Sequence, residues 1–232
     1  MQFVFHQRAG EQEVVLEGES FVHIFGARRT RADTTLLLRN LYDDMLYCYK
    51  ITHITRKSAH LMLVSSTNSL RKSSRFSHII WAITQPQTIQ KALPVFNELG
   101  LSRLSLFWSD FSQRTLKLDL ERLKRILIAS CEQCGRSDLC QIEILENLPS
   151  VLKSYPKAWI LDFGAEVLGE AHITTGLGLE NGVVIGAEGG FSPKERKAFA
   201  HHKIFSLDSP FVLRSQTAAT AVLALFSIAA FG

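Results

Sequence analysis

The stretch Ile185-Gly186-Ala187-Glu188-Gly189-Gly190-Phe191-Ser192-Pro193-Lys194-Glu195 decides the fold of the C-terminal part of the chain. It begins at the end of an apolar run, residues 182–185, that is typical of a short buried strand. The glycines then allow a sharp turn and leave no Cβ between the backbone and a ligand. Ser192 suits an N-cap, Pro193 the first helical position and Glu195 the third, so a helix begins at once. This order indicates a ligand-binding edge of an open α/β sheet.

The same loop could also be a plain turn between a strand and a helix, because glycine turns are common. It lacks the Lys-Ser/Thr of a P-loop and the G-x-G-x-x-G spacing of a dinucleotide fold. A pyrophosphate ligand is therefore not expected. A second segment, which follows about one helix later, favours a binding loop over a plain turn.

That segment is Asp208-Ser209-Pro210-Phe211-Val212-Leu213-Arg214-Ser215-Gln216-Thr217-Ala218. Together with residues 186–195 it resembles the RsmE family of 16S ribosomal RNA uridine methyltransferases, a branch of the SPOUT class. That family carries a G-P-E-G-G-F-S-x-x-E loop and an L-G-x-R-I-L-R-x-E-T-A segment around S-adenosylmethionine. Residues 132–136 are similar to its E-Q-x-x-R, and residues 22–29 to its H-x-x-R-V-L-R. Three departures matter: Ala187 replaces the family's Pro, Ser209-Pro210 replaces its Leu-Gly turn, and Gln216 replaces its Glu.

The resemblance implies an α/β fold in which a small PUA-like β-barrel precedes a SPOUT domain with a C-terminal trefoil knot. We expect the barrel over residues 1–68, a linker over 69–77 and the methyltransferase domain over 78–232. Short β-rich runs before residue 65 favour a small barrel. The polar, basic residues 65–75 are typical of a linker.

Strands and helices alternate beyond the linker. This alternation indicates a parallel sheet covered by helices. We expect a turn at Gly164, directly after the last of these strands. The segments are residues 79–83, 88–99, 104–107, 118–134, 141–144 and 159–163.

The chain has 232 residues and 46% hydrophobic content, enough for one large domain or two smaller ones. Its net charge of +4 lies wholly in residues 1–76, which hold eleven Lys/Arg against seven Asp/Glu. Clustered cations can neutralise RNA phosphates, although a solvated surface gives the same count. We expect RNA contacts from Arg28, Arg29 and Arg31. The other cations that follow Ser20 in this region include Arg39, Arg56, Lys57, Arg71, Lys72 and Arg75.

Four cysteines at no secretory spacing, without a signal peptide, predict a cytoplasmic location. Cys131, Cys134 and Cys140 admit a zinc site, but buried thiols explain them better and we expect no metal. Residues 215–232 carry no charged side chain. This tail is too short and too polar for a membrane span, so we expect a buried helix and no membrane partner. The resemblance implies that it threads the knot and packs against a second subunit in a homodimer.

The resemblance also implies that S-adenosylmethionine lies between three loops after strand ends, residues 161–164, 185–190 and 207–214. Glu188 would orient its loop or complement positive charge, or would be a solvated turn residue. The residues expected to contact the cofactor are Leu161, Phe163, Ile185, Gly186, Glu188, Gly189, Gly190, Leu207, Phe211 and Leu213.

Methyl transfer from a sulfonium is an in-line displacement, so the enzyme mainly holds two reactants in attack geometry. The family's acceptor is N3 of a uridine in the decoding region of 16S rRNA, and its proton must leave. Arg214 is the first candidate to stabilise the uracil anion or grip the nucleotide, and Gln133 and Arg136 could assist from a helix end. A structural hydrogen bond and an ordinary helix-dipole contact are the alternatives for these arginines.

The implied partner is 16S rRNA or the small ribosomal subunit. Two other functions stay open at this stage. One is a noncatalytic RNA-binding or ribosome-assembly protein of the same fold. The other is a SPOUT methyltransferase that acts on transfer RNA.

Overall fold

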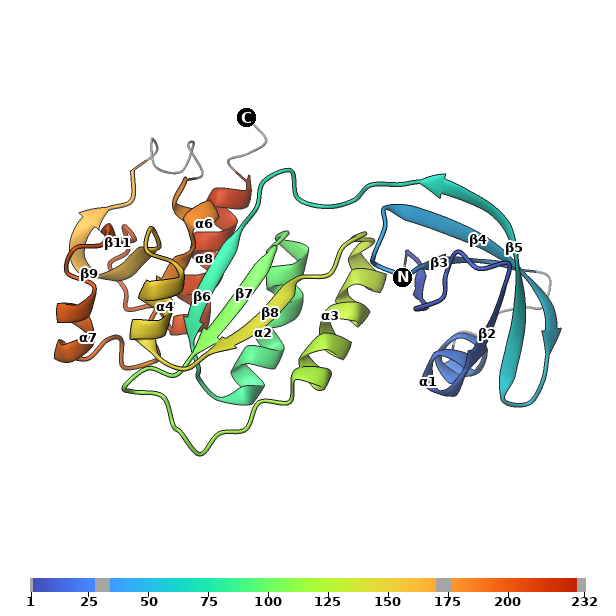
Figure 1. The fold of residues 1–232 in the computed structure, drawn as a ribbon, viewed down its shortest axis with the longest axis horizontal. Coiled ribbons are helices and arrows are strands. Elements are labelled where there is room, and N and C mark those ends of the chain that lie inside the picture. Colours follow the sequence, from blue (N-terminus) through green and yellow to red (C-terminus); the bar gives the residue numbers. More distant parts are fainter. Residues whose placement is uncertain (1, 28–33, 170–176, 229–232) are drawn as a thin grey trace. The chain divides into compact units, whose positions relative to one another are not determined.

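A computed structural model of the chain describes residues 2–27, 34–169 and 177–228 (Figure 1). The chain divides into two compact units. The first comprises residues 1–72 and 128–139, and the second comprises residues 73–127 and 140–232. The placement of residues 128–139 in the first unit was not predicted, because nothing in their sequence separates them from the helix that they continue. The predicted boundaries at residues 68 and 78 stay a prediction.

The first unit contains a five-stranded sheet in the order β1-β3-β4-β5-β2. β1 pairs with β3 in parallel, and the other neighbours are antiparallel. Within the described residues no pairing joins β1 to β2, so the sheet of the expected small barrel is an open half-barrel. The strands are β1 (Val4–Phe5), β2 (Glu13–Glu17), β3 (Thr35–Arg39), β4 (Met45–Ile54) and β5 (Ser58–Asn68).

The prediction that residues 65–68 belong to a linker was wrong. β5 continues through them, and Ser65 and Asn68 pair with Cys48 and Met45 of β4. Their side chains are exposed, so backbone pairing with β4 outweighs their low preference for strands.

The core of the first unit lies between the sheet and one helical segment. That segment is α1 (Gly18–Phe21), continued by the π-helical η1 (Val22–Ala27). Phe21 and Ile24 from it pack on buried residues of the sheet such as Leu38, Tyr49 and Leu61. The Tyr49 hydroxyl donates to the carbonyl of Glu11 at 2.6 Å, which satisfies this buried phenol.

Arg39 does not belong to the cationic surface in which the sequence placed it. It is only 2% exposed, and its guanidinium lies 5.4 Å from the ring centroid of Phe3. It also donates to the carbonyl of Ser69 at 2.8 Å. Lys72 pairs with Asp44 at 3.2 Å. The phosphate-binding capacity of this unit is therefore smaller than the count of its cations indicates.

The second unit is built on a six-stranded, fully parallel sheet in the order β11-β9-β10-β6-β7-β8. This confirms the parallel sheet predicted from the alternation of strands and helices. Its strands are β6 (His78–Ala82), β7 (Arg103–Phe107), β8 (Gln141–Leu145), β9 (Trp159–Val167), β10 (Val183–Ile185) and β11 (Ile204–Ser206).

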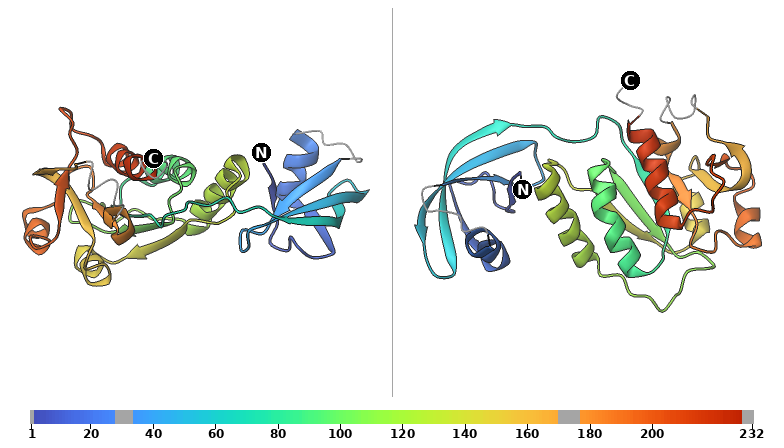
Figure 2. Two further views of the ribbon diagram at one scale, coloured as in Figure 1. Left: turned by 90° about the horizontal axis from the view of Figure 1, so that it is seen from above. Right: turned by 180° about the vertical axis from the view of Figure 1, so that it is seen from behind.

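Helices cover both faces of this sheet, with α2 and α8 side by side on one face and α4 on the other (Figures 1 and 2). Residues 128–134 of α3 are grouped with the first unit. The expected trefoil knot stays a prediction. The helices are α2 (Pro86–Glu98), α3 (Leu120–Cys134), α4 (Leu148–Ser154), α6 (Leu177–Asn181), α7 (Pro193–Ala198) and α8 (Ser215–Ile228).

The turn that we expected at Gly164 is absent, because β9 runs on to Val167. Gly164 has a φ of 71°, a left-handed value that lets the strand bend without ending. Pairing with β11 resumes beyond it after a shift of register, with Phe205 opposite Glu166 and Ser206 opposite Val167. The sequence suggested a turn because a glycine in a strand more often interrupts it.

The uncharged C-terminal segment forms α8, as predicted. One of its faces is buried against α2, β6 and β10 through Ala219, Val222, Leu223 and Phe226. The opposite face is open in the single chain, where Leu225 is 40% exposed. No helix within the described part of the chain is long and apolar enough to cross a membrane.

Candidate functional site

A cavity of about 240 Å³ lies at the ends of β10 and β11 and beside residues 161–163, which belong to β9 and not to the loop expected at residues 161–164. Because all strands of the sheet are parallel, their carboxyl ends meet at one edge, where open α/β sheets bind ligands. All ten residues that we expected to contact the cofactor line this cavity. The structure thus brings these ten residues together, while their contact with the cofactor stays a prediction. Of the other lining residues, four lie within the three segments expected to surround the cofactor and four lie outside them. The first four are Asp162, Ala187, Ser209 and Val212, and the second four are Phe191, Ser206, Ser215 and Ala218.

The glycine loop forms one wall of the cavity as a tight turn. The Gly190 amide donates to the carbonyl of Ala187 at 2.9 Å, and Gly190 has a φ of 72°. A Cβ at Gly186 would lie 2.9 Å from the carbonyl carbon and oxygen of Gly190. Two glycines are therefore required by the turn itself, one for its φ and one for the close approach of backbone.

The helix that follows begins as the sequence predicted. Ser192 is the N-cap of α7, its Oγ accepts from the Glu195 amide at 3.1 Å, and Glu195 Oε2 accepts from the Ser192 amide at 2.9 Å. This reciprocal pair is a capping box, with Pro193 at the first helical position. Ser192 Oγ also donates to Asp110 Oδ2 at 2.5 Å, which attaches the helix start to the loop after β7.

Asp162 gives the cavity its charged wall, and it is already paired. Both of its oxygens accept from the Arg196 guanidinium, at 2.7 and 3.0 Å. The hydrogen bonds from Arg196 to Asp162 raise the pKa of that guanidinium, so Arg196 stays charged. Because the two charges neutralise each other, this wall offers polarity without strong attraction for a cation.

One hydroxyl in the cavity is free to bind a ligand. Ser215 Oγ is buried and has no hydrogen-bond partner among the described residues, and Ser215 lines the cavity. A buried hydroxyl without a partner costs free energy that a bound molecule would recover. The apolar side chains of Leu161, Ile185 and Leu213, the bare backbone of the glycine loop and this hydroxyl fit a small molecule with apolar and polar parts.

Of the three residues predicted to act in catalysis, Arg214 is the one whose chain neighbours line this cavity. Arg214 is exposed and lies between Leu213 and Ser215, which both line it. Gln133 and Arg136 belong to the first unit. Gln133 is exposed, whereas Arg136 is buried and bound by both carboxylate oxygens of Asp138 at 2.7 and 2.8 Å. This ion pair favours the structural alternative for Arg136.

The remaining expectations concern RNA and metal. Arg28, Arg29 and Arg31, predicted to contact RNA, lie outside the described residues. Cys131 and Cys140 are buried thiols, and Cys131 Sγ lies 3.4 Å from the Asp138 carbonyl. In the described ranges no three His, Cys, Asp or Glu side chains are grouped so that they could hold a metal ion.

A second polar cluster lies inside the sheet and includes a serine next to a histidine. Ser105 Oγ is 2.6 Å from His78 Nε2 and 2.5 Å from Glu143 Oε1, which also accepts from the Tyr155 hydroxyl. Burial, with a smaller contribution from the charge of Arg103, lowers the pKa of His78 to about 4. His78 and Ser105 are 1% and 0% exposed, so no substrate can reach them and the cluster is structural.

A parallel α/β unit with a ligand cavity at its strand ends defines a class of cofactor-binding domain. Within that class, the model of a family described as the RNA methyltransferase domain matches residues 71–227. Two relatives, the ribosomal RNA small subunit methyltransferases E of two Helicobacter pylori strains, are each 42% identical over 98% of this chain and 100% of their own length. The chain belongs to the ribosomal RNA small subunit methyltransferase E family.

Solved structures have the same fold. A ribosomal RNA small subunit methyltransferase E from Neisseria gonorrhoeae, bound to S-adenosylmethionine, is 20% identical with a TM-score of 0.83. A methyltransferase from Legionella pneumophila, also in complex with S-adenosylmethionine, is 22% identical with a TM-score of 0.83. Each comparison covers 98% of this chain and 97% of the other chain.

Proposed function

We propose that this protein transfers a methyl group from S-adenosylmethionine to N3 of a uridine in the decoding region of 16S rRNA. The observation that carries the proposal is the convergence of ten residues on one cavity at the carboxyl edge of the sheet. They come from β9, from the end of β10 with its glycine loop, and from the segment after β11. Membership of the methyltransferase E family supports ribosomal RNA as the acceptor. The resemblance of residues 186–195 and 208–218 to the family's motifs supports the cofactor and the atom.

The residues around the cavity would bind and orient the cofactor. S-adenosylmethionine, when bound, supplies the methyl group on a positively charged sulfur. Leu161, Ile185 and Leu213 would exclude water from it, and Ser215 Oγ would donate or accept a hydrogen bond that the chain leaves free. The glycine loop would let backbone amides and carbonyls approach without a side chain between them.

Arg214 would act on the acceptor. Uridine N3 carries a proton, which passes to solvent water, and its loss leaves a negative charge on the uracil ring. An exposed guanidinium between two cavity-lining residues can stabilise that anion while the methyl group is transferred. We keep Gln133 as a second candidate, and we assign Arg136 to the structure of the first unit because Asp138 engages it.

We also propose that the protein is a cytoplasmic homodimer that binds RNA through the first unit. The open face of α8 and the exposed Phe211 and Val212, which are 75% and 81% accessible, leave apolar surface around the cavity for a second subunit to cover. The trefoil knot of the SPOUT class is part of the same proposal. Arg28, Arg29 and Arg31 are its candidate RNA contacts.

Mass spectrometry of rRNA tests the proposal. A strain that lacks the gene should lack one 3-methyluridine in 16S rRNA, and the wild-type gene should restore it. A gene that carries Arg214→Ala should restore it poorly, although calorimetry should show unchanged affinity for S-adenosylmethionine. Unchanged 3-methyluridine in the deletion strain would contradict the acceptor. Mass spectrometry of transfer RNA from the same strains would reveal a transfer RNA substrate. If calorimetry shows no binding of S-adenosylmethionine to the wild-type protein, a noncatalytic protein is favoured.

A further inference from the structure

The loop after β7 is a part of the second unit that the proposed function does not yet use. It contains Trp108-Ser109-Asp110-Phe111-Ser112-Gln113-Arg114-Thr115-Leu116-Lys117, in which two aromatic residues are followed by two basic ones. β7 and β10 both flank β6 in a parallel arrangement. The loop therefore leaves the sheet at the edge that also carries the glycine loop.

Hydrogen bonds that are buried or partly buried hold the first part of this loop. The Asp110 amide donates to Glu195 Oε1 at 3.0 Å, and Asp110 Oδ2 accepts from Ser192 Oγ at 2.5 Å. Ser112 Oγ donates to the carbonyl of Ile83 at 2.7 Å. The residue between them, Phe111, is thus held in place from both sides.

Phe111 is nevertheless 51% exposed, which is unusual for a phenylalanine held so firmly. One edge of its ring faces the glycine loop, because a Cβ at Gly189 would lie 3.2 Å from Phe111 Cδ2. The rest of the side chain is open beside the rim of the cavity. A fixed and solvent-exposed aromatic ring next to a cofactor site is suited to stacking with a planar ligand.

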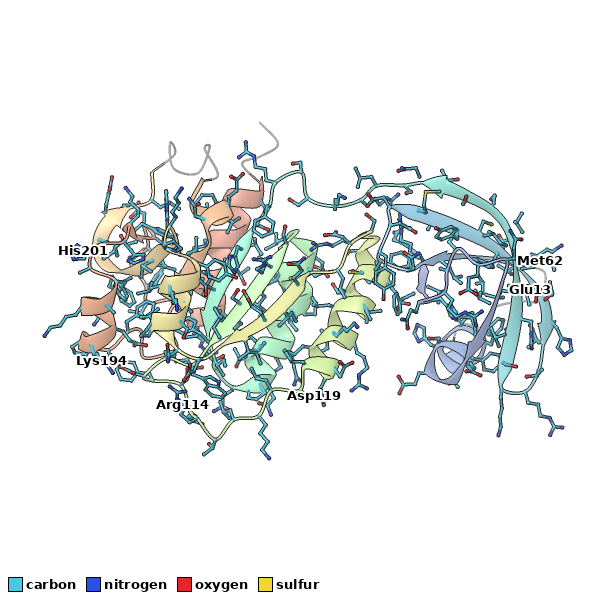
Figure 3. All side chains as sticks on the ribbon, in the orientation of Figure 1. Glu13, Met62, Arg114, Asp119, Lys194 and His201 are labelled. Carbon is cyan, nitrogen blue, oxygen red and sulfur yellow. The ribbon has the colours of Figure 1, made fainter. Side chains whose placement is uncertain are left out.

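The same loop also carries positive charge. The Arg114 guanidinium lies 5.8 Å from the ring centroid of Trp108, and Lys117 is exposed. The one acidic side chain of the segment, Asp110, is engaged by Ser192. Figure 3 shows the side chains of Arg114 on this loop and of Lys194 at the start of α7. Aromatic rings beside cations bind single-stranded RNA, whose bases stack while its phosphates meet the cations.

We propose that Phe111 is a stacking surface for an unstacked base of the RNA substrate, with Arg114 and Lys117 contacting the adjoining phosphates. This inference rests on the proposed function and assigns substrate contacts to the second unit beside its cavity. RNA methyltransferases must hold their target base out of its helix or stack, and a rigid aromatic at the cavity rim provides the surface for it.

The test compares Phe111→Ala, Phe111→Leu and Phe111→Tyr in the full-length protein. Small ribosomal subunits from a strain that lacks the gene serve as the substrate. Loss of one base stack should weaken binding and raise KM by about 5- to 100-fold in the alanine and leucine variants. The tyrosine variant should stay near wild type, and kcat should change little. Calorimetry should give unchanged affinity for S-adenosylmethionine in all three.

Charge is tested separately. Arg114→Gln should weaken binding and reduce its salt dependence, since one phosphate contact is lost. The matched control is Lys157→Gln, an exposed lysine just before β9 and so at the opposite edge of the sheet. It should leave affinity unchanged.

Equal affinity and KM in wild type and Phe111→Ala would overturn the proposal. A second result would also overturn it. If Phe111→Ala loses cofactor binding and Phe111→Leu restores it, then Phe111 acts by packing against Gly189 and not by stacking on a base. If the wild type transfers no methyl group to small subunits, the proposed function fails instead. The role of Phe111 is then decided by the affinity for rRNA alone, where equal values for wild type and variants reject it.

Discussion

Gly186 and Gly190 meet across the turn of the cavity loop, and their contact is between backbones. A Cβ at Gly186 would come within 2.9 Å of two Gly190 atoms that cannot move without opening the turn. Gly186→Ala should therefore weaken S-adenosylmethionine binding at least tenfold, which corresponds to about 1.4 kcal/mol. Calorimetry on the folded variant and on the wild type measures this affinity.

Two other glycines are controls for this substitution. At Gly189 the neighbour is the Phe111 ring, which would lie 3.2 Å from an added Cβ, and a side chain can yield. Gly189→Ala should thus be milder than Gly186→Ala. Gly26, in the first unit, has only Val22 Cγ1 at 3.7 Å, so Gly26→Ala should leave cofactor affinity unchanged. Wild-type affinity in Gly186→Ala would show that the turn is not part of the site.

His78 makes the stability of the second unit depend on pH. Its pKa is about 4 in the folded chain against an ordinary value of 6.5. As pH falls from 6.5 to 4, His78 becomes protonated in the unfolded chain but stays neutral in the folded chain. The free energy of unfolding should therefore fall as pH falls through this window, and at pH 4.5 the loss should be about 2–3 kcal/mol. Above pH 6.5 His78 is neutral in both states, so its effect on stability should no longer change with pH.

Urea unfolding at pH 7, 5.5 and 4.5 tests this for wild type and His78→Gln. Glutamine can still hydrogen-bond to Ser105 but does not titrate in this range. The variant should be less stable at pH 7 and should lose less stability on acidification. Parallel curves for the two proteins would mean that His78 does not carry the effect, and that Glu143 or other carboxylates do.

Among the helices and strands, the short helix α7 depends on its first turn for stability. The helix has only six residues, so its capping box and its link to Asp110 supply much of its stability. Ser192→Ala removes the acceptor for the Glu195 amide and should cost about 1–2 kcal/mol. The melting temperature should fall by about 3–6 °C.

Ser192→Thr is the matched control, because threonine caps helices through the same oxygen. Glu195→Gln should also be mild, since glutamine completes a capping box. A melting temperature equal to wild type in Ser192→Ala would mean that packing of Phe191 and Phe199 alone holds the helix.

At the scale of the whole molecule, the open face of α8 bears on the proposed dimer. The helix has no charged residue, and Leu225 lies on the face that the single chain leaves exposed. If a second subunit covers this face, Leu225→Arg buries a charge without a partner and should weaken the dimer at least about tenfold. Sedimentation velocity at several concentrations measures this.

Leu120→Arg is the control, because Leu120 is similarly exposed at the start of α3. It should leave the oligomeric state unchanged. A wild-type protein that sediments as a monomer at every concentration would contradict the dimer and leave the apolar surface around the cavity without its proposed cover.

Much of the local structure of this protein follows from short stretches of its sequence. The strand, glycine loop and capped helix at residues 182–198 follow from apolar runs, backbone freedom and the capping chemistry of Ser192 and Glu195, all of which act within a few residues. The parallel sheet followed from the alternation of strands and helices, because parallel strands need such crossovers. The motifs in residues 186–195 and 208–218 also led to the residues around the cavity.

Contacts between residues that are far apart in the sequence became known from the tertiary fold alone. It paired Asp162 with Arg196, left Ser215 Oγ without a partner in the cavity and buried Arg39 beneath Phe3. It also carried β9 through Gly164 and brought Phe111 against Gly189. Such contacts depend on sheet order and register, which are set by packing of the whole core. No short stretch of sequence contains that information.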